Sequence, residues 1–594
     1  MTIQLLQPWN GNAPAIYTTF TAAEEASLIA KGLARLYPVA NAASPVVRTG
    51  SYVGTGNLRR VACGMRPDVV FVVADDSQYM IWRHQGTYRG RAVRMGSKGG
   101  HSSGGIIELT DDGFQVTSAA QSNTNATTYH WVAIADNGSG RLVMGGHIGN
   151  GAVRDFSALI EETPVFFMAG RDNTFSRWFR ATGQAKAYPM DAAAPSATMI
   201  SSLSPVTISA AADLNELTEY PSNPGAEGVD WIAFLDCPAW SVLQYTGEGT
   251  ASDYVVRLPG WSAEEYGAMA IIKGHNDSTP TAAQIVVPAK SSTRALPADG
   301  TSWTSTAVSA WNGPLLTLSG TGGANYLKVN EAATVYTVFA IKASPLTQSV
   351  SQLPSRTYVG RPALRCETGG GIITQVTEDV FNIEANANSV RPITVEWFGI
   401  YDARAAESPL WAFSQTPAVC ALRLFGATGS WDTTNDLTEL RLVRYSGSEV
   451  EDNFGRRPAR GALVHLVLRS NGTHDSSTYR LTMNGRYHME VKRNHGIGQT
   501  ATTKLAFMCH RDTSDAIADS SVGMAMALCR LWGRELTNSE VAARAQICFG
   551  AQDVADVSDF FEEWDAANYG AGVLPATRNI ENRGVVTNCT QIYV

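Results

Sequence analysis

Oxygen-bearing side chains gather in one short stretch of the chain, WDTTNDLTEL, which begins at Trp431. Asp432, Asn435, Asp436 and Glu439 supply its carboxylates and its amide. Ca²⁺ binds oxygen ligands of this kind, although the spacing does not match an EF-hand loop. A solvated polar loop would have the same composition. The stretch therefore suggests a calcium site, with a plain surface loop as the alternative.

Two tryptophans are candidates for binding sugars. Trp431 lies beside the acidic stretch, and Trp411 lies in SPLWAFSQ shortly before it. An exposed indole ring offers a flat apolar face on which a sugar ring can stack, whereas a buried indole packs in a core. The hypothesis is a glycan-binding surface near Trp411 and Trp431, and two core tryptophans are the alternative.

The patterns typical of enzymes are incomplete. GHSSG at residues 100–104 matches the nucleophile elbow of hydrolases, but that motif needs a strand before it and a helix after it. Here a glycine-rich loop precedes it, and GIIELTDDGF after it is typical of a strand. Glu396 in TVEWFG has no second carboxylate at the spacing that glycoside cleavage needs. We therefore expect no enzymatic activity and no required cofactor.

Composition excludes several classes of protein. The 594 residues carry a net charge of −8, and no run of Lys or Arg exceeds two, so we expect no nucleic-acid partner. No apolar stretch is long enough for a membrane span, and the N-terminus does not resemble a secretory signal. The eight cysteines include no C-x-x-C pair, which indicates buried thiols in a protein made in a reducing cytoplasm.

A motif with two glycines one residue apart organises the first half of the chain. It occurs as YVGTG at Tyr52, HIGNG at His147 and YTGEG at Tyr245. An apolar run follows each copy, and each unit closes on a similar strand, YHWVAI, VDWIAF or YTVFAI. Such runs are too apolar for a strand with one face in water, so they should lie in a core. The pattern predicts three tandem β domains of one fold, with Gly54, Gly149 and Gly247 at equivalent positions.

These observations give a division of the whole chain. It comprises a leader at 1–47, β repeats at 48–137, 138–238 and 239–345, a linker at 346–358, a further β domain at 359–550 and a tail at 551–594. Within the leader, Thr21 and Glu24 have capping-box spacing. Leu28, Ile29 and Leu33 lie in the short amphipathic helix that this predicts. The helix would anchor the chain to another protein or dock on the first repeat.

The leader and the repeats together resemble structural proteins of tailed bacteriophages. The leader matches in LLQPWNGNAPAIYTTFTAAEEASLIAKGLA, and the repeats match best in Tyr52–Gly56, Pro67–Val73 and Trp131–Ala133. The later copies depart from the pattern, with His147 in place of the tyrosine and Val338 in place of the tryptophan. The resemblance implies a virion protein with a shared fold in its repeats, and it implies a homotrimer.

The C-terminal half resembles a laminin-G-like, concanavalin-like jelly roll. The matching pieces are VHLVLRSNG, YRLTMNGR and, most specifically, RLWGRELTNSEV at Arg530–Val541. Asn484-Gly485 between alternating strands predicts a hairpin, and Thr537 with Glu540 predicts a capped helix. The resemblance implies a sandwich of two antiparallel sheets, of a kind that often binds glycans or proteins. The chain as a whole is therefore expected to be all-β, with tandem sandwich-like repeats before the jelly roll.

The tail is rich in aromatic residues, with Phe560, Phe561 and Trp564 close together. We expect one helix around DVSDFFEEWDAANYG, then an extended arm, with these three side chains at or near a contact between subunits. A tail packed on its own domain is the alternative.

The favoured hypothesis is a non-enzymatic bacteriophage virion protein, a fibre or decoration protein made in the host cytoplasm. It would attach by its N-terminus to the capsid, portal or tail and display the jelly roll. The alternative is a receptor-binding tail fibre that attaches to the host by gripping a surface glycan.

Overall fold

The structure is a computed structural model. It describes residues 3–5, 16–17, 34–36, 44–75, 79–84, 87, 92–95, 105–110, 112–136, 139–148, 153–156, 160, 162–171, 178–197, 199–204, 206–208, 228–276, 281–290, 294–298, 304–305, 307–320, 329–344, 362–374, 392–402, 408–416, 419–428, 438–445, 449–453, 462–471, 477–485, 487–493, 504–511, 517–548, 556–560, 562–570, 572–574 and 584–593. Strands dominate these residues, so the predicted all-β fold class is confirmed.

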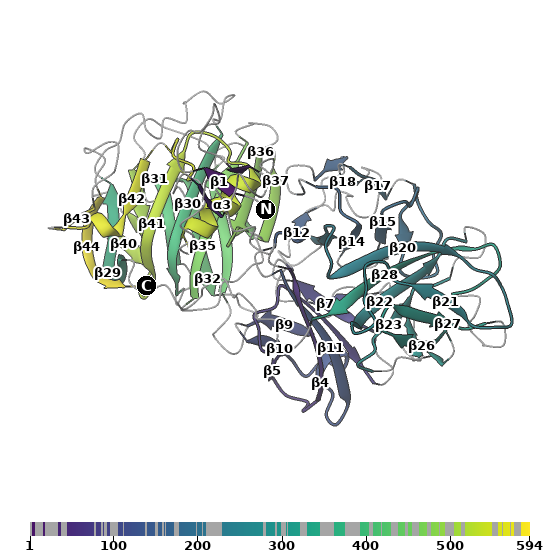
Figure 1. Cartoon of the computed structure of the whole chain (residues 1–594). Coiled ribbons are helices and arrows are strands. Elements are labelled where there is room, and N and C mark those ends of the chain that lie inside the picture. The colour runs from purple at the N-terminus through teal and green to yellow at the C-terminus, as the bar shows by residue number, and fades with distance from the viewer. Residues whose placement is uncertain are drawn as a thin grey trace.

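Three groups of strands follow one another with the same pairing order (Figure 1). The first group has a main sheet β4-β11-β6-β7-β8 and a small sheet β5-β10-β9, the second has β12-β19-β14-β15-β16 and β13-β18-β17, and the third has β20-β28-β22-β23-β24-β25 and β21-β27-β26. The helix α2 (Ala120–Asn123) lies in the first group. Since each group pairs its successive strands in the same order, the three groups share one topology.

The bounds of these strands are as follows. The first group contains β4 (Val46–Val53), β5 (Arg59–Ala62), β6 (Val69–Ala74), β7 (Ile81–His84), β8 (Val93–Arg94), β9 (Ile106–Leu109), β10 (Gly113–Val116) and β11 (Thr128–Ala135). The second contains β12 (Leu142–Ile148), β13 (Arg154–Asp155), β14 (Phe166–Arg171), β15 (Trp178–Ala181), β16 (Tyr188–Pro189), β17 (Ile200–Leu203), β18 (Val206–Ile208) and β19 (Gly228–Phe234). The third contains β20 (Trp240–Thr246), β21 (Tyr254–Arg257), β22 (Tyr266–Gly274), β23 (Gln284–Val286), β24 (Arg294–Pro297), β25 (Thr304–Ser305), β26 (Val308–Asn312), β27 (Leu315–Leu318) and β28 (Val335–Ala343).

The glycine motif of the first repeat packs against the turn before β11. The amide of Gly54 donates to the carbonyl of Thr127 at 2.7 Å, and a Cβ atom on Gly54 would lie 1.9 Å from the carbonyl oxygen of Thr124. The Tyr52 ring stacks on Tyr129 with ring centroids 5.2 Å apart, and its hydroxyl donates to the carbonyl of Ser122. Only glycine allows this close approach of two backbones.

The third repeat reproduces this arrangement. The amide of Gly247 donates to the carbonyl of Thr334 at 2.8 Å, and a Cβ atom there would lie 2.3 Å from the carbonyl oxygen of Glu331. Tyr245 stacks on Tyr336 at 5.1 Å, as Tyr52 stacks on Tyr129. Gly54 and Gly247 are thus equivalent, whereas Gly149 lies outside the described residues. The domain boundaries themselves stay a prediction.

Each main sheet is buried on both faces, which explains why its strands are apolar throughout. In β11, Trp131 and Ala133 face the core of the first repeat, whereas Val132 and Ile134 face the opposite way into a larger core. The second and third repeats also contribute side chains to this larger core, including Phe166 and Phe339. The rings of Phe166 and Phe339 stack with centroids 4.1 Å apart. The larger core therefore joins one repeat to another.

Each repeat meets the next at an interface, here called a seam, and all three seams contain polar contacts. One contact at each seam is His84 with Asp230, Gln184 with Thr337, and Lys290 with Asp75. The third repeat also returns to the first through its last described residue, because the amide of Ser344 donates to the carbonyl of Val47 at 2.9 Å. The three repeats therefore contact one another cyclically, the first with the second, the second with the third and the third with the first.

The strands that follow the third repeat form a jelly-roll sandwich (Figure 1). They are β29 (Pro362–Thr374), β30 (Ile393–Tyr401), β31 (Ser408–Thr416), β32 (Val419–Thr428), β33 (Thr438–Tyr445), β34 (Glu449–Asn453), β35 (Ala462–Ser470), β36 (Ser477–Met483), β37 (Tyr487–Arg493), β38 (Lys504–Phe507), β39 (Cys509–Arg511), β40 (Ile517–Ser520), β41 (Ala525–Trp532), β42 (Glu562–Asp565), β43 (Val573–Leu574) and β44 (Gly584–Tyr593). One sheet runs from β37 through β36, β35, β30 and β41, and the other runs from β34 through β33, β32, β31 and β38. β29 pairs with both sheets, through β41 and through β38.

One strand joins the repeats to the jelly roll. β12 pairs with β19 inside the second repeat and, on its other edge, runs parallel to β37, with Gly145 opposite His488. The equivalent strands of the other repeats, β4 and β20, pair among the described strands only with β11 and β28. The second repeat and the jelly roll therefore share one continuous sheet.

The tail differs from the sequence-based expectation. The helix predicted around DVSDFFEEWDAANYG is wrong, because β42 pairs there with β41, and only the short 3₁₀ helix η3 (Ala566–Asn568) follows. The arm beyond it is β44, which pairs with β29, and β43 pairs with β44. A strand forms here and not a helix, because alternate tail residues, Glu562 and Trp564, are buried against the sandwich.

Two local predictions in the jelly roll are confirmed. Asn484 and Gly485 turn the chain between β36 and β37 with φ values of 53° and 71°, and three residues separate the paired Met483 and Tyr487, so the predicted hairpin is present. The helix α3 (Asn538–Cys548) starts with the predicted capping box, in which the Thr537 amide donates to Glu540 at 2.8 Å. In the leader, β1 (Ile3–Leu5) pairs with β2 (Ile16–Tyr17) and β3 (Ala34–Leu36). Leu28, Ile29, Leu33 and the predicted helix lie outside the described residues.

Candidate functional site

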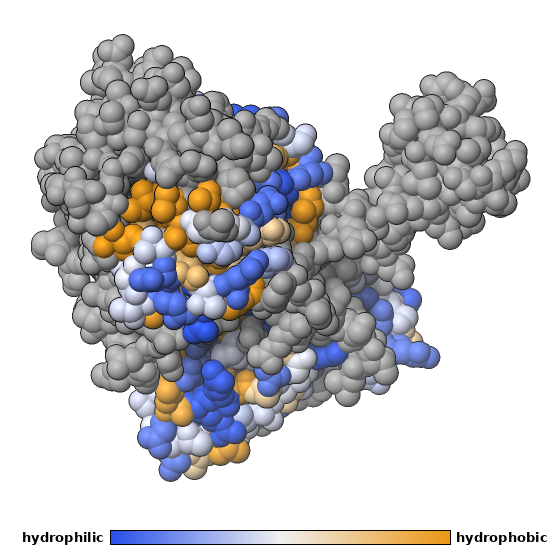
Figure 2. Space-filling view, turned by 90° about the vertical axis from the view of Figure 1, so that its left-hand side faces the viewer, coloured by the Kyte–Doolittle hydropathy of each residue, from blue (hydrophilic) through white to orange (hydrophobic). Residues whose placement is uncertain are grey.

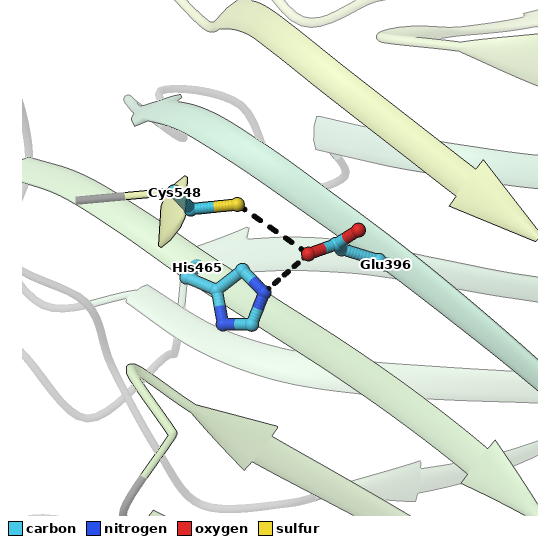
Figure 3. A group of neighbouring side chains, drawn as sticks. All are labelled: Glu396, His465 and Cys548. Carbon is cyan, nitrogen blue, oxygen red and sulfur yellow. Dashed lines mark hydrogen bonds and ion pairs between the residues drawn. The ribbon is translucent and has the colours of Figure 1, made fainter. Parts of the chain in front are cut away.

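The densest group of chemically competent side chains surrounds Glu396 in the jelly roll (Figure 3). β30 lies between β35 and β41, so Glu396 is on a central strand. Alternation along β30 sends Val395 and Trp397 into the sandwich core, and Glu396 to the other face of the sheet. His465 on β35 is opposite Phe398, two residues from Glu396, and so shares that face.

The helix α3 supplies the other two members of the group. Arg544 and Cys548 are four residues apart, which places them on one face of the helix. The capping box fixes where α3 begins. Val541 of this helix packs against Trp532, the last residue of β41, and against Leu536, which follows that strand. The helix therefore presents a cation and a thiol to Glu396.

The carboxylate of Glu396 accepts hydrogen bonds from three side chains. His465 Nε2 lies 2.7 Å from Oε1, and Arg544 Nε and Nη2 each lie 3.1 Å from one of the two oxygens. Cys548 Sγ lies 3.4 Å from Oε1. None of the four side chains is more than 1% exposed. The carboxylate is thus fully occupied inside the protein.

Electrostatics keeps this carboxylate ionised. Burial by itself would raise the pKa of Glu396, but the charge of Arg544 and the hydrogen bond from His465 outweigh burial and hold the pKa well below its usual range. Burial would likewise lower the pKa of Arg544, but Glu396 holds it above its ordinary value. Arg544 also contacts Asp556 at 2.6 Å, which links the buried pair to the surface.

The geometry disfavours catalysis by these residues. A cysteine nucleophile needs a base and access to substrate, whereas the Cys548 thiol is buried and points at Glu396. Glutamate, histidine and cysteine are metal ligands, and their ligand atoms lie within 4.8 Å of one another. The guanidinium of Arg544 already neutralises the carboxylate and would repel a metal cation. The group therefore fits a structural network that fastens α3 to the sheet.

The residues singled out from the sequence lie elsewhere. Trp411 is fully buried in the sandwich core, so the expectation that it stacks on a sugar is wrong. Trp431, Asp432, Asn435 and Asp436 lie outside the described residues. Glu439 lies on β33, paired with Ala427. The GHSSG motif lies outside the described residues. The strand β9 follows it, which confirms the prediction that a strand and not a helix comes after the motif.

The aromatic residues of the tail are used inside the chain. Trp564 is fully buried and packs against Phe507, and Phe560 is 8% exposed and packs against Trp532. These two side chains complete the core of their own domain and are not exposed for a subunit contact, and a contact near them stays a prediction. Phe561 lies outside the described residues. The alternative of a tail packed on its own domain is the one observed.

Glu396 stands out in the sequence, but its partners do not. The available signal was weak: a lone carboxylate in an apolar strand needs a cation, and Arg544 and Cys548 recur with helical spacing after the capping box. Nothing in the sequence links β30 to that helix before the sheet order is known.

The described residues thus define an all-β chain of three repeats and a jelly-roll sandwich, and none of their helices is long and apolar enough to cross a membrane. No family model matches the sequence, and no curated protein matches it. Among solved structures, a heptameric SAP-like pentraxin from Limulus polyphemus is similar at 12% identity and a TM-score of 0.28, covering 40% of this chain and 96% of that one.

Two further solved structures show a similar degree of likeness. The CBM40 of the Ruminococcus gnavus IT-sialidase, bound to α2,3 sialyllactose, has 12% identity and a TM-score of 0.24, covering 31% of this chain and 97% of that chain. The enzymatically active domain of tailspike protein 2 from bacteriophage CBA120 has 12% identity and a TM-score of 0.24, covering 36% of this chain and 34% of that chain.

Proposed function

We propose that the chain is a non-enzymatic structural protein of a bacteriophage particle, a fibre or decoration protein that displays its jelly roll. The observation that carries the proposal is the pairing of β12 with β37, which continues the sheet of the second repeat into the jelly roll. A shared sheet fixes the orientation of two domains, whereas a linker alone leaves them free to move. The resemblance of the leader and the repeats to phage virion proteins is the reason for assigning the chain to a phage particle.

The buried chemistry of the jelly roll supports a structural role. Glu396, His465 and Arg544 satisfy one another in the interior, and the larger core and the seams hold the repeats together. Such a body suits display on the capsid, portal or tail after synthesis in the host cytoplasm. The resemblance implies a homotrimer. In such an assembly three chains would contact one another cyclically, as the three repeats do within one chain.

The test is the protein content of purified particles. Mass spectrometry of gradient-purified particles from a lysed producing culture should find the full chain at a fixed ratio to the major capsid protein. A chain lacking residues 1–40 should stay folded and soluble but be absent from the particles, because the proposed anchor lies in the leader. A full-length chain that remains wholly outside the particles would contradict the proposal.

A glycan-binding role is the second candidate, and one observation favours it. Thr428 pairs with Thr438, so the strands β32 and β33 hold both ends of the connection that carries Trp431, Asp432 and Asp436. An aromatic ring and carboxylates on one hairpin connection suit a sugar and a calcium ion. A glycan array probed with Ca²⁺ and with chelator tests this. Binding should be lost in Trp431→Ala and kept in Trp431→Phe, and an array without any bound glycan would contradict it.

A further inference from the structure

The first and last strands of the jelly roll place two cysteines opposite each other. β29 and β44 are antiparallel neighbours (Figure 1), and their register pairs Cys366 directly with Cys589. Both are free thiols in this structure. Cys366 is fully buried and Cys589 is half-buried on the C-terminal strand.

The backbone hydrogen bonds show which type of cross-strand pair this is. The amide of Cys366 donates to Met524 at 2.8 Å, and its carbonyl accepts from Gly523 at 2.9 Å. Both bonds point away from β44, so Cys366 and Cys589 form a non-hydrogen-bonded pair. In such pairs the Cα atoms approach to about 4.5 Å. A disulfide needs a Cα separation of about 4.4–6.8 Å, so the strand pairing already satisfies this requirement.

The local backbone brings the sulfur atoms together. A bulge in β29 begins after Cys366, where the register with β44 shifts between Cys366 and Gly371, and Gly369 has a φ of +70°. Directly paired residues of antiparallel strands present their side chains on the same face, so the two thiols are neighbours. A third thiol, Cys509, lies so close to Gly371 that a Cβ atom there would be 2.3 Å from its sulfur.

We propose that Cys366 and Cys589 form a reactive dithiol site whose substrates are small-molecule disulfides such as oxidised glutathione. The thiolate of Cys589 attacks one sulfur of the external disulfide, forming a mixed disulfide and releasing one thiol. The thiol of Cys366 then gives up its proton to solvent and attacks the sulfur of Cys589, which releases the second thiol. The two cysteines are oxidised to one disulfide, and the external disulfide is reduced to two thiols.

The surroundings assign the order of attack. The neighbouring Cys366 thiol lowers the pKa of Cys589, which is the more accessible thiol and so the first nucleophile. The neighbouring Cys589 thiol, together with burial, raises the pKa of Cys366, which suits the second, resolving position. Burial raises the pKa of Cys509 to about 12, which leaves that thiol unreactive.

The product would tie the C-terminal strand to the start of the domain. β44 is paired with β29 and, at its start, with β43, and among the described strands it has no other neighbour. Figure 2 looks onto this side of the molecule, where the described surface mixes apolar and polar residues. A disulfide between first and last strands would restrain this edge of the sandwich, because it closes a long loop of chain.

The experiment treats the full-length protein with oxidised glutathione and maps its disulfides by mass spectrometry. The native protein should lose two hydrogen atoms and yield a linked peptide pair containing Cys366 and Cys589. Cys509→Ser should give the same pair. Cys366→Ser should stop at the mixed disulfide and carry one glutathione on Cys589, whereas Cys589→Ser should carry neither the link nor glutathione on Cys366.

Circular dichroism first confirms that each variant is folded, and the trapped glutathione on Cys366→Ser reports the site even if the link itself fails to close. A link from Cys589 to Cys509 would overturn the proposal. So would a folded native protein in which both thiols remain free, or a Cys366→Ser variant that takes up no glutathione.

Discussion

The repeats and the jelly roll bury their polar groups in different ways. In the repeats, buried polar side chains lie at the seams between copies of one fold, such as His84 with Asp230 and Gln184 with Thr337. In the jelly roll, one buried pair of opposite charges, Glu396 with Arg544, holds a helix to a sheet. Cohesion in the repeats is spread over three seams and a large apolar core. A single substitution should therefore cost more at Glu396 than at any seam.

The largest expected effect follows from breaking the buried pair. Glu396→Gln removes the charge but keeps the shape, and should lower the free energy of unfolding by about 3–5 kcal/mol, because Arg544 then loses its buried counter-charge. Urea unfolding measures it. Glu162→Gln is the control, because its partner Arg141 is 28% exposed and Glu162 is 54% exposed, and such pairs contribute about 0–1 kcal/mol.

The double variant Glu396→Leu with Arg544→Met sharpens this result. Replacing both charges by apolar groups should cost less than Glu396→Gln alone, since no buried charge is left unpaired. An equal loss of unfolding free energy in Glu162→Gln and Glu396→Gln would show that the buried pair contributes no more to stability than the exposed pair.

Acid should weaken the jelly roll through the same carboxylate. The pKa of Glu396 is lowered in the folded protein, so its contribution is complete above the unfolded pKa of about 4.3 and declines as the pH falls toward the folded value. The difference in stability between the native protein and Glu396→Gln should therefore be constant from about pH 5 to 8 and shrink below about pH 4. A difference that grows on acidification would contradict this assignment.

In the repeats, the largest single effect should come from the glycine motif. Gly54→Ala and Gly247→Ala each force a Cβ atom to within 2.3 Å or less of a backbone oxygen, and each should cost about 1–3 kcal/mol. Gly570→Ala is the matched control, since nothing lies within 4 Å of a Cβ atom there. Thermal unfolding compares the three variants, and a neutral Gly54→Ala would contradict the equivalence of the two motifs.

A smaller effect should come from the start of α3. Thr537→Ala removes the hydroxyl that accepts from the Glu540 amide at 3.3 Å, and should cost about 1 kcal/mol. Thr537→Ser keeps the hydroxyl and should be nearly neutral. Equal destabilisation by both variants would show that the methyl group, and not the cap, is what matters there.

Features encoded locally were predictable from the sequence. The Asn484-Gly485 hairpin and the Thr537 capping box each depend on residues that are close together along the chain, and the structure places them as expected. The repeat motif was predictable for another reason, because its recurrence along the chain shows it. The tail was misjudged because its aromatic residues fit either a helix or a buried strand. Trp564 lies on a strand only because β41 offers it an open edge.

Features that depend on distant strands were not predictable. Trp411 is buried because β31 pairs with both β32 and β38, and the sequence gives no sign of these partners. Glu396 finds Arg544 for the same reason, since α3 reaches it only after the sandwich has closed. The seams between repeats likewise require the relative placement of three domains.

The most direct test of this account is amide hydrogen exchange, resolved to single residues, in the three equivalent strands β4, β12 and β20. β12 pairs on both edges, with β19 and with β37, so amides pointing to either side should exchange slowly. In β4 and β20, the amides that face β11 and β28 should be protected, so protected and unprotected residues should alternate. Val47 is the exception in β4, because its amide donates to Ser344 Oγ at 3.0 Å. Alternation in β12 as well would show that the jelly roll is not carried on the sheet of the second repeat, and would contradict the account.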